Sequence, residues 1–487
     1  MLISQLVAFF RTAIIASLFG ASSIVDAYNL GLSIPILLSG VIGGWLQAGF
    51  VGRYMERNRE PNSSNAATFR TAMGLVLIAI TFTLSLGMVL TSHSISQFLA
   101  PTAHEQAHIQ TVAAIKIIGW SLVPTVLSDY ITLLLACHGK FIAASAAPVV
   151  NAIVAAAGLL IWPTHTLDSL LWTLVAGLTV QLVILIITLT RIGLPFSLSG
   201  SHLKADIVAT LKVAFPLLPA VVFSNGTQTT IQVFCSRLGE GAVAIYGYAS
   251  KLHGALTQII VVGISTVLLP HLAGMLAEGR REEIRLLMGQ ISRASLLVSL
   301  FVVIGVMLLG ENTISVLLGR GRFDQRLTLE VSHSWLLLSL SIFPFALSTF
   351  FAKLFQAMQR PILLSTSSFL SFIITSFTCW IGLEQYGLSA VMLAPFSAQT
   401  AVLCFFTWKY REQFDEKRLL RDWIKTIGFA VLIFSPAIAV DTLGLKDFSP
   451  INAKTLFFSR ALIFVAISLF IAKLFNITRW IREGNTP

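Results

Sequence analysis

Charged residues are scarce in this chain. They make up 11% of its 487 residues, whereas hydrophobic residues make up 55% and the mean hydropathy is +0.83. Soluble globular domains contain about 25% charged residues. The composition therefore excludes an ordinary soluble domain and indicates a protein embedded in a lipid bilayer.

Motifs for enzymatic or metal chemistry are also missing. The four cysteines show no CxxC spacing, and the nine histidines are scattered without HExxH or another ligand spacing. No Walker phosphate loop occurs, which excludes ATP hydrolysis by that route. We therefore expect a protein that is not an enzyme and that holds no metal or cofactor. Coupling to a monovalent cation or to a proton stays open.

Long apolar runs are present instead. A helix needs about 20 apolar residues to cross a bilayer, and about fourteen runs approach that length. They cover residues 1–19, 28–51, 71–90, 111–136, 141–162, 169–189, 213–235, 244–269, 286–309, 335–351, 362–381, 388–407, 426–440 and 456–470. The sequence thus predicts an all-α polytopic membrane protein with about fourteen transmembrane helices.

Lys and Arg gather in alternate loops. With the N-terminus in the cytoplasm, the basic stretches 53–59, 280–285 and 409–421 all lie on the cytoplasmic side, where positive charge is normally enriched. The net charge of +11 therefore reflects topology, and no nucleic-acid partner is expected. One outside loop breaks the rule with Arg320, Arg322 and Arg326. We predict a short ordered segment at 319–324 that packs on the outer mouth of the second lobe.

The chain repeats itself weakly. Residues 19–22 resemble residues 238–241 at an offset of 219, and residues 137–140 resemble 357–360 at an offset of 220. Six helices per copy is an even number, so both copies cross the membrane in the same sense. This predicts parallel lobes related by an axis along the membrane normal, with a cavity between them. We expect six-helix lobes at 1–200 and 201–420, followed by two additional helices at 421–487.

Two cations interrupt the apolar runs. Arg11 lies in the middle of run 1–19, which contains no acidic residue, and Lys251 lies within run 244–269. A cation at the centre of a membrane helix costs about 2.5–3.5 kcal/mol even on insertion scales, and such residues usually face a polar cavity. We predict that Arg11 and Lys251 bind a negatively charged substrate there.

Five further residues are candidates for gating or coupling. Asp26 either caps the second helix or pairs with a cation when an outer gate closes. Asp129, within the fourth helix, is either a coupling site or the acceptor of a structural hydrogen bond. Pro35, Gly43 and Gly44 either loosen the second helix for gating or allow close helix packing.

Several of these residues fall in recognisable motifs. The stretch 10–21 (FRTAIIASLFGA), then Asp26-Ala27-Tyr28 and 34–38 (IPILL), resembles the opening signature of the MurJ (MviN) lipid II flippases. The stretches 263–270 (GISTVLLP) and 317–324 (LLGRGRFD) resemble later motifs of that family. The resemblance covers nearly the whole chain, with the same number of helices.

The resemblance implies a function. The family belongs to the multidrug/oligosaccharidyl-lipid/polysaccharide exporter superfamily, whose members have two six-helix lobes and a central cavity that alternates its access. It implies a flippase in the bacterial cytoplasmic (inner) membrane that moves a polyprenyl-diphosphate-linked glycan to the outer leaflet for cell-wall biogenesis. A groove at 421–487 would hold the polyprenyl tail. Proteins of cell-envelope glycan synthesis are candidate partners.

The family's cavity cations are only partly kept. Gln5 stands where the family has an arginine, Ser39 and Gly40 replace an arginine pair, and Lys251 replaces another arginine. Arg11 survives. The cargo is therefore either lipid II or a related exopolysaccharide precursor. A cation-coupled multidrug exporter of the same superfamily and a non-transporting membrane scaffold in glycan assembly are the alternative functions.

Overall fold

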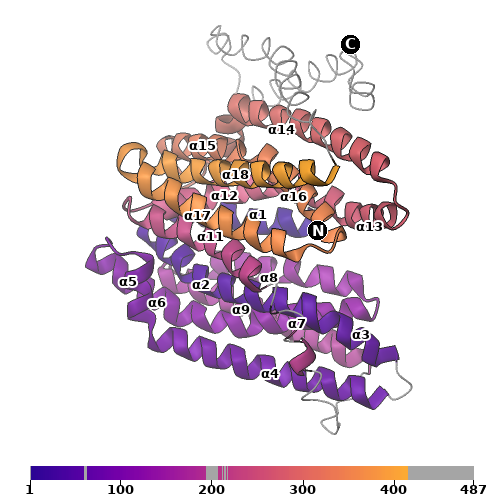
Figure 1. Ribbon diagram of the computed structural model, residues 1–487. Coiled ribbons are helices and arrows are strands. Elements are labelled where there is room, and N and C mark those ends of the chain that lie inside the picture. The colour runs from indigo at the N-terminus through magenta and orange to yellow at the C-terminus, as the bar shows by residue number, and fades with distance from the viewer. Residues whose placement is uncertain are drawn as a thin grey trace. The chain divides into compact units, whose positions relative to one another are not determined.

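Helices joined by short turns make up the chain. The structure, a computed structural model, describes residues 2–59, 63–193, 207–210, 212, 215 and 218–414, and no strand occurs within these ranges. The all-α prediction is confirmed (Figure 1). The expected runs 426–440 and 456–470, and with them the expected tail groove at 421–487, lie outside the described residues.

The first group of helices lies within residues 2–193. It comprises α1 (Leu2–Phe19), α2 (Ser23–Trp45), η1 (Leu46–Phe50), α3 (Val51–Arg59), α4 (Ser63–Leu90), α5 (Ser92–Leu99), α6 (Glu105–Ile118), η2 (Gly119–Ser121), α7 (Leu122–Cys137), α8 (Phe141–Ile161) and α9 (Leu167–Arg191). Here η1 is a π-helical and η2 a 3₁₀ segment.

The second group begins at residue 218. It comprises α11 (Leu218–Ser236), α12 (Ala242–Thr257), the π-helical η4 (Gln258–Val262), α13 (Gly263–Ala277), α14 (Arg281–Leu317), α15 (Gln325–Ser339), α16 (Ile342–Ala357), α17 (Pro361–Tyr386) and α18 (Leu388–Phe414). As far as the described residues go, the apolar runs that begin before residue 400 fall on one helix or on helices joined by a short break.

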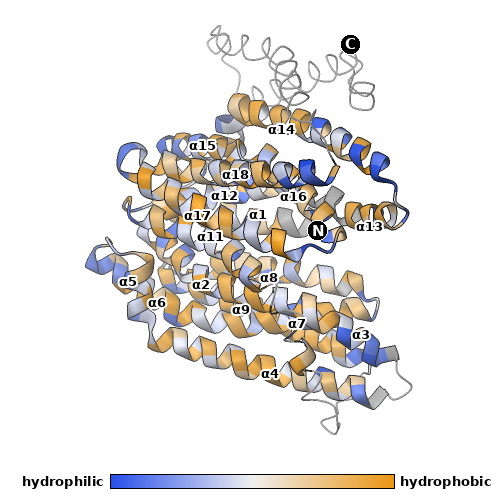
Figure 2. Cartoon of the chain, viewed as in Figure 1, coloured by the Kyte–Doolittle hydropathy of each residue, from blue (hydrophilic) through white to orange (hydrophobic). Residues whose placement is uncertain are grey.

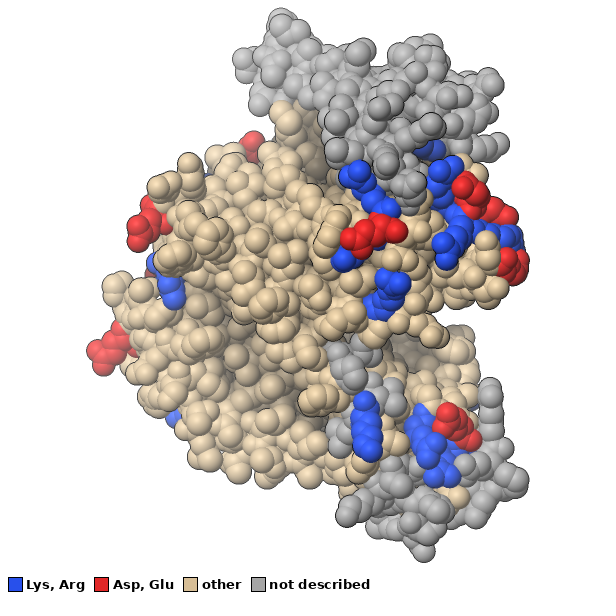
Figure 3. All heavy atoms as spheres, viewed as in Figure 1, with Lys and Arg blue, Asp and Glu red and all other residues tan. Residues whose placement is uncertain are grey.

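Many of these helices suit a membrane. Within the described ranges, nine continuous helical spans, some of which join two or more of these helices, are long and apolar enough to cross one, and Val7–Phe19 and Leu268–Ala277 are shorter apolar helices. Apolar residues cover most helix surfaces, while hydrophilic residues gather at α3, near α5 and around the turn between α13 and α14 (Figure 2). On the visible face, the charged side chains cluster toward helix ends and leave broad uncharged areas (Figure 3). The chain is therefore a multi-pass membrane protein.

By its internal contacts the chain divides into two compact units. The first contains residues 1–247 together with 321–323, and the second contains residues 248–320 and those from 324 onward. These boundaries differ from the lobes expected at 1–200 and 201–420, because α11 packs against α2 in the first unit. The expected lobes follow the sequence repeat instead of contacts, and their rotational relation stays a prediction.

An aromatic core holds the first unit together at the π-helical η1. Phe50 stacks on Tyr54 with ring centroids 5.4 Å apart and meets the rings of Phe69 and Tyr130 at 5.3 and 5.2 Å. The Tyr54 hydroxyl lies 2.8 Å from His138 Nε2, so its polar end is satisfied. This packing joins α3, α4 and α7 around the η1 segment.

The second unit has its own aromatic core. The rings of Phe351 and Tyr410 lie 5.2 Å apart, and those of Phe355 and Phe406 lie 5.3 Å apart. These contacts pack α16 against α18, and α16 also contacts α13 and α14. The two units thus bury separate clusters of large side chains.

The two turns paired by the sequence repeat share a backbone conformation, which also occurs at Gly279 (φ +71°), so the repeat itself stays a prediction. Gly139 (φ +73°) and Gln359 (φ +56°) both adopt the left-handed conformation, 220 positions apart. The following amides of Lys140 and Arg360 donate to carbonyls five residues earlier, at 2.8 and 3.0 Å. These are the same helix-ending turns. A positive φ is strained for Gln359 but not for glycine. The turn at 359 therefore has the same conformation as the turn at 139 although its residue is not glycine.

Candidate functional site

Arg11 is held by an aromatic hydroxyl and not by an acid. Its side chain is half-buried on α1, and a terminal guanidinium N–H donates to the hydroxyl of Tyr28 on α2. The guanidinium carbon also lies 5.9 Å from the centre of the Tyr28 ring. No carboxylate of the described residues lies within ion-pair distance of Arg11. The cation is therefore fixed in place while its charge is not neutralised.

One donor of Arg11 is left over. Its Nε is buried without a hydrogen-bond partner in the described part of the chain. A buried donor without a partner costs about 1–3 kcal/mol, more when it is charged. An anionic ligand with several oxygens would remove this cost, since a guanidinium offers five N–H donors in a planar fork.

Lys251 lies on α12 with an exposed side chain. Two residues later, His253 is largely buried, and its Nε2 lies 3.5 Å from the hydroxyl of Ser341 at the break between α15 and α16. Arg11 belongs to the first unit and Lys251 to the second. Joint binding of one substrate by these two residues therefore stays a prediction.

Asp26 caps a helix other than the expected one. Its carboxylate accepts the backbone N–H groups of Gly241 at 2.6 Å and Ala244 at 2.7 Å, at the start of α12. This is neither the cap on the second helix nor the cation pair that the sequence left open, and a gating role of Asp26 stays a prediction. Asp26 also stands in the first turn of its own helix, α2, so the positive ends of two helix dipoles converge on one buried carboxylate.

A second acid caps in the opposite direction. Glu240 lies just before α12 and accepts the backbone N–H of Ser23, the first residue of α2, at 2.9 Å. Ser22, the residue in the N-cap position, makes no capping bond with its side chain. Asp26, in the first turn of α2, thus caps the start of α12, and Glu240, just before α12, caps the start of α2. We call Asp26 and Glu240 the crossed caps.

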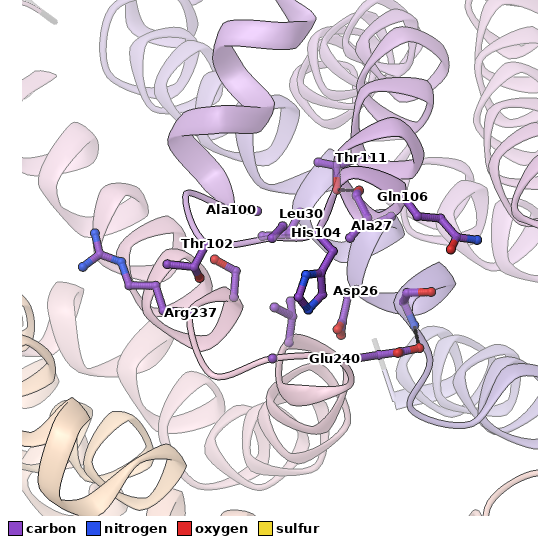
Figure 4. A pocket seen from close by; sticks show the side chains of 16 residues that line it. Asp26, Ala27, Leu30, Ala100, Thr102, His104, Gln106, Thr111, Arg237 and Glu240 are labelled. Carbon is purple, nitrogen blue, oxygen red and sulfur yellow. Dashed lines mark hydrogen bonds between the residues drawn. The ribbon is translucent and has the colours of Figure 1, made fainter.

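A cavity of about 520 Å³ adjoins the crossed caps (Figure 4). It is bounded by the start of α2, the segment between α5 and α6, and the turn between α11 and α12. Asp26, Glu240, His104 and Arg237 are among its polar lining residues, and the others are Ser23, Thr102, Gln106, Thr111 and Ser236. The charge distribution of the sequence predicts that this end of the first unit faces outward.

The glycines of α2 have different roles. A Cβ on Gly44 would lie 2.9 Å from Val221 of α11, and one on Gly40 would lie 2.7 Å from Asn225 of the same helix. A Cβ on Gly43 would meet nothing within 4 Å. Gly44 therefore allows close helix packing, whereas Gly43 has no packing reason and stays a hinge candidate just before η1. Pro35 is buried within α2.

Asp129 is exposed on α7, and no hydrogen bond to its carboxylate occurs in the described part of the chain. The structural hydrogen bond that the sequence left open is therefore not seen, and Asp129 stays a coupling candidate. No cluster of three or more metal-ligating side chains occurs among the described residues either.

Two functional partners were missed by sequence reasoning. Tyr28 follows Arg11 by 17 residues across a helix hairpin, and Glu240 follows Ser23 by 217 residues. Tyr28 lies within the motif Asp26-Ala27-Tyr28, which indicates the family resemblance but not a contact with Arg11. Glu240 stood within the repeat motif 238–241, which signalled a turn but not a cap.

The fold has close relatives among solved structures. A structure described as "Lipid II flippase MurJ, inward closed conformation" superposes with a TM-score of 0.81 at 18% identity, covering 97% of this chain and 96% of that one. An inward-facing multidrug resistance MATE family transporter of the MOP superfamily superposes with a TM-score of 0.72 at 13% identity, covering 86% and 96%. The fold therefore defines a helical membrane protein with the architecture of that transporter superfamily.

Sequence comparison supplies the family. The family model described as "Lipid II flippase MurJ" matches residues 15–476. A "Probable lipid II flippase MurJ" from Rhizobium meliloti (strain 1021) is 24% identical over 494 residues, which cover 97% of this chain and 91% of that protein. The chain belongs to the lipid II flippase MurJ family and is a membrane transporter, not an enzyme. The resemblance read from the sequence motifs is confirmed.

Proposed function

We propose that this protein moves a polyprenyl-diphosphate-linked glycan from the inner to the outer leaflet of the bacterial cytoplasmic membrane, with its N-terminus in the cytoplasm. Lipid II is the substrate named by the family and by the relative described above. The observation that carries the proposal is Arg11, a fixed cation without a carboxylate partner and with a buried, unpaired Nε–H on an apolar helix.

The diphosphate is the part of the substrate that Arg11 binds. Two adjacent phosphates concentrate negative charge, and a medium of low dielectric constant strengthens their attraction to a fixed cation. The planar fork of Arg11 donates to several phosphate oxygens at once, and Lys251 contributes a second, more mobile cation. The glycan then occupies the polar volume, and the polyprenyl tail stays in the membrane.

Transport proceeds by alternating access, with the crossed caps as the outer seal. Asp26 and Glu240 tie the starts of α2 and α12 together, which closes the outer end of the first unit. The substrate loads from the cytoplasmic side in this state. When α2 and α12 separate on the outside, both carboxylates gain water as a partner, and the substrate leaves.

Asp26 does not support a carrier of cationic drugs. Such a carrier needs a carboxylate that is available to its cargo, and Asp26 already accepts two backbone N–H groups. Asp129 is exposed on α7, and we assign it to coupling and not to cargo binding. The cation that faces a ligand is Arg11. An unpaired charged donor inside a membrane helix destabilises the protein. In a transporter, substrate binding offsets this cost, whereas a scaffold without transport activity binds no substrate that could offset it.

The experiment is a flipping assay with purified protein in liposomes. Fluorescent lipid II, a polyprenyl-diphosphate oligosaccharide and a fluorescent phospholipid are compared. We expect both diphosphate lipids or one of them to be flipped and the phospholipid to be ignored. Arg11→Ala should abolish flipping and Arg11→Lys should restore only part of it, while Lys116→Ala, which removes an exposed cation on α6, should change little. Flipping of neither diphosphate lipid by the native protein would refute the proposal.

A further inference from the structure

The loop with excess positive charge is a tight, ordered turn between α14 and α15. At its end, the Asp324 carboxylate accepts the N–H of Leu327 at 2.8 Å and so caps α15. At its beginning, the amides of Leu318 and Gly319 donate to carbonyls of the last turn of α14. The prediction of an ordered segment at 319–324 is confirmed. Its expected packing on the second lobe was wrong for residues 321–323, which belong to the first unit.

These three residues close on the end of α1. The backbone N–H of Arg322 donates to the carbonyl of Ser17 at 2.9 Å, and the Phe323 side chain is buried. The last carbonyls of a helix have no donor within the helix. Arg322 therefore supplies a hydrogen bond that α1 cannot make for itself. We call residues 321–323 the α1 clasp.

Two glycines make this contact possible. Gly321 has φ +62°, and a Cβ there would lie 2.2 Å from the Ser17 carbonyl oxygen. Gly20 has φ +61°, and its Cβ would lie 2.9 Å from the carbonyl oxygen of Arg322. The backbone around Gly321 and Arg322 therefore lies directly against the backbone at the end of α1, without a side chain between them. Any side chain at Gly321 must both strain the chain and push the clasp away.

The three arginines of this loop have exposed side chains. Arg326 is paired with Glu330 at 3.0 Å. Arg322 contacts the end of α1 through its backbone N–H.

We propose that the α1 clasp is a positioning element for Arg11. Ser17 lies six residues after Arg11 on the same helix, about 9 Å along the axis at about 1.5 Å per residue. A hydrogen bond to one carbonyl fixes the rotation of α1 about its axis, and that rotation sets the direction of the Arg11 guanidinium. Tyr28 then holds the guanidinium itself. The inference rests on the proposed role of Arg11 in diphosphate binding.

The test compares two glycines of equal conformation. Gly321→Ala is compared with Gly279→Ala, because Gly279 has φ +71° and open space around its Cβ position. Flipping of lipid II and the apparent affinity for undecaprenyl diphosphate are measured for each. We expect Gly321→Ala to weaken both by roughly tenfold or more, and Gly279→Ala to stay within about twofold, since only the former meets a clash in addition to strain.

A double-mutant cycle separates positioning from general support. If the clasp acts through Arg11, then Gly321→Ala should add little to the loss caused by Arg11→Lys. Phe323→Ala opens the clasp without a backbone clash and should give the same non-additive result if Gly321→Ala fails to fold. Independent, additive losses in both cycles would overturn the inference while Arg11→Ala still abolishes flipping. Normal flipping by Arg11→Ala would instead overturn the proposed function.

Discussion

The crossed caps make a quantitative prediction about the outer seal. In Asp26→Asn the side chain keeps one acceptor oxygen, but its NH₂ group faces a backbone N–H that it cannot bind. A hydrogen bond to a charged group contributes about 1.5–3 kcal/mol, and a carboxylate at a partly buried helix start adds up to about 2 kcal/mol. We expect the closed state to lose roughly 2–4 kcal/mol relative to a state open to the outside, where water satisfies either side chain.

This loss is large enough to change the resting state. At about 1.4 kcal/mol per tenfold change, the equilibrium should shift roughly 30- to 700-fold toward the outward-open state. The shift can be read from the labelling rate of a cysteine by a membrane-impermeant maleimide, in a chain from which Cys137, Cys235, Cys379 and Cys404 have been removed. Ala27→Cys is the reporter, because Ala27 is buried and lines the cavity beside Asp26.

Two controls frame the experiment. Thr102→Cys reports on an exposed position of the same cavity and should be labelled equally fast with and without Asp26→Asn. Glu240→Gln should accelerate labelling of Ala27→Cys much less, since Glu240 is exposed and water competes for its bond. Unchanged labelling of Ala27→Cys in Asp26→Asn would refute the crossed caps as the outer seal.

Three further outcomes are expected. Gly44→Ala should lower the free energy of unfolding in detergent by about 1–3 kcal/mol, because the added methyl group overpacks the contact with α11. Gly43→Ala should preserve this stability but slow flipping, and both quantities are measured on the same preparations. Burial and the nearby Arg70 lower the pKa of His138; folding therefore opposes its protonation, and the melting temperature should fall as the pH drops below about 6.5, an effect that His138→Gln should reduce. Asp129→Asn should abolish the dependence of flipping on an ion gradient, and a dependence left intact would remove Asp129 as the coupling site.

Hydropathy predicted the helices well because the bilayer sets their length. Apolar runs of about 20 residues are a strong local signal, and the described residues of the runs that begin before residue 400 lie on helices. The turns at Gly139 and Gln359 share a left-handed residue although the residue type differs, and the six-helix repeat that pairs them stays a prediction.

The contacts of the site could be predicted only in part. The functional importance of Arg11 could be predicted, because a cation in an apolar run is costly whatever the direction of its side chain. The cap on α12 was not, since Asp26 reaches amides 215 and 218 positions away and no local pattern marks such a contact. The same holds for Gly321, whose need for glycine comes from the Ser17 carbonyl. Sequence signals which residues are unusual, and tertiary structure supplies their partners.

The central claim is that Arg11 binds the diphosphate of the cargo. Native mass spectrometry of the purified protein with undecaprenyl diphosphate and undecaprenyl monophosphate tests it most directly. The account predicts that the native protein retains the diphosphate lipid in preference to the monophosphate, that Arg11→Ala loses this preference, and that Lys116→Ala keeps it. Equal preference for the diphosphate in Arg11→Ala and in the native protein would contradict the account.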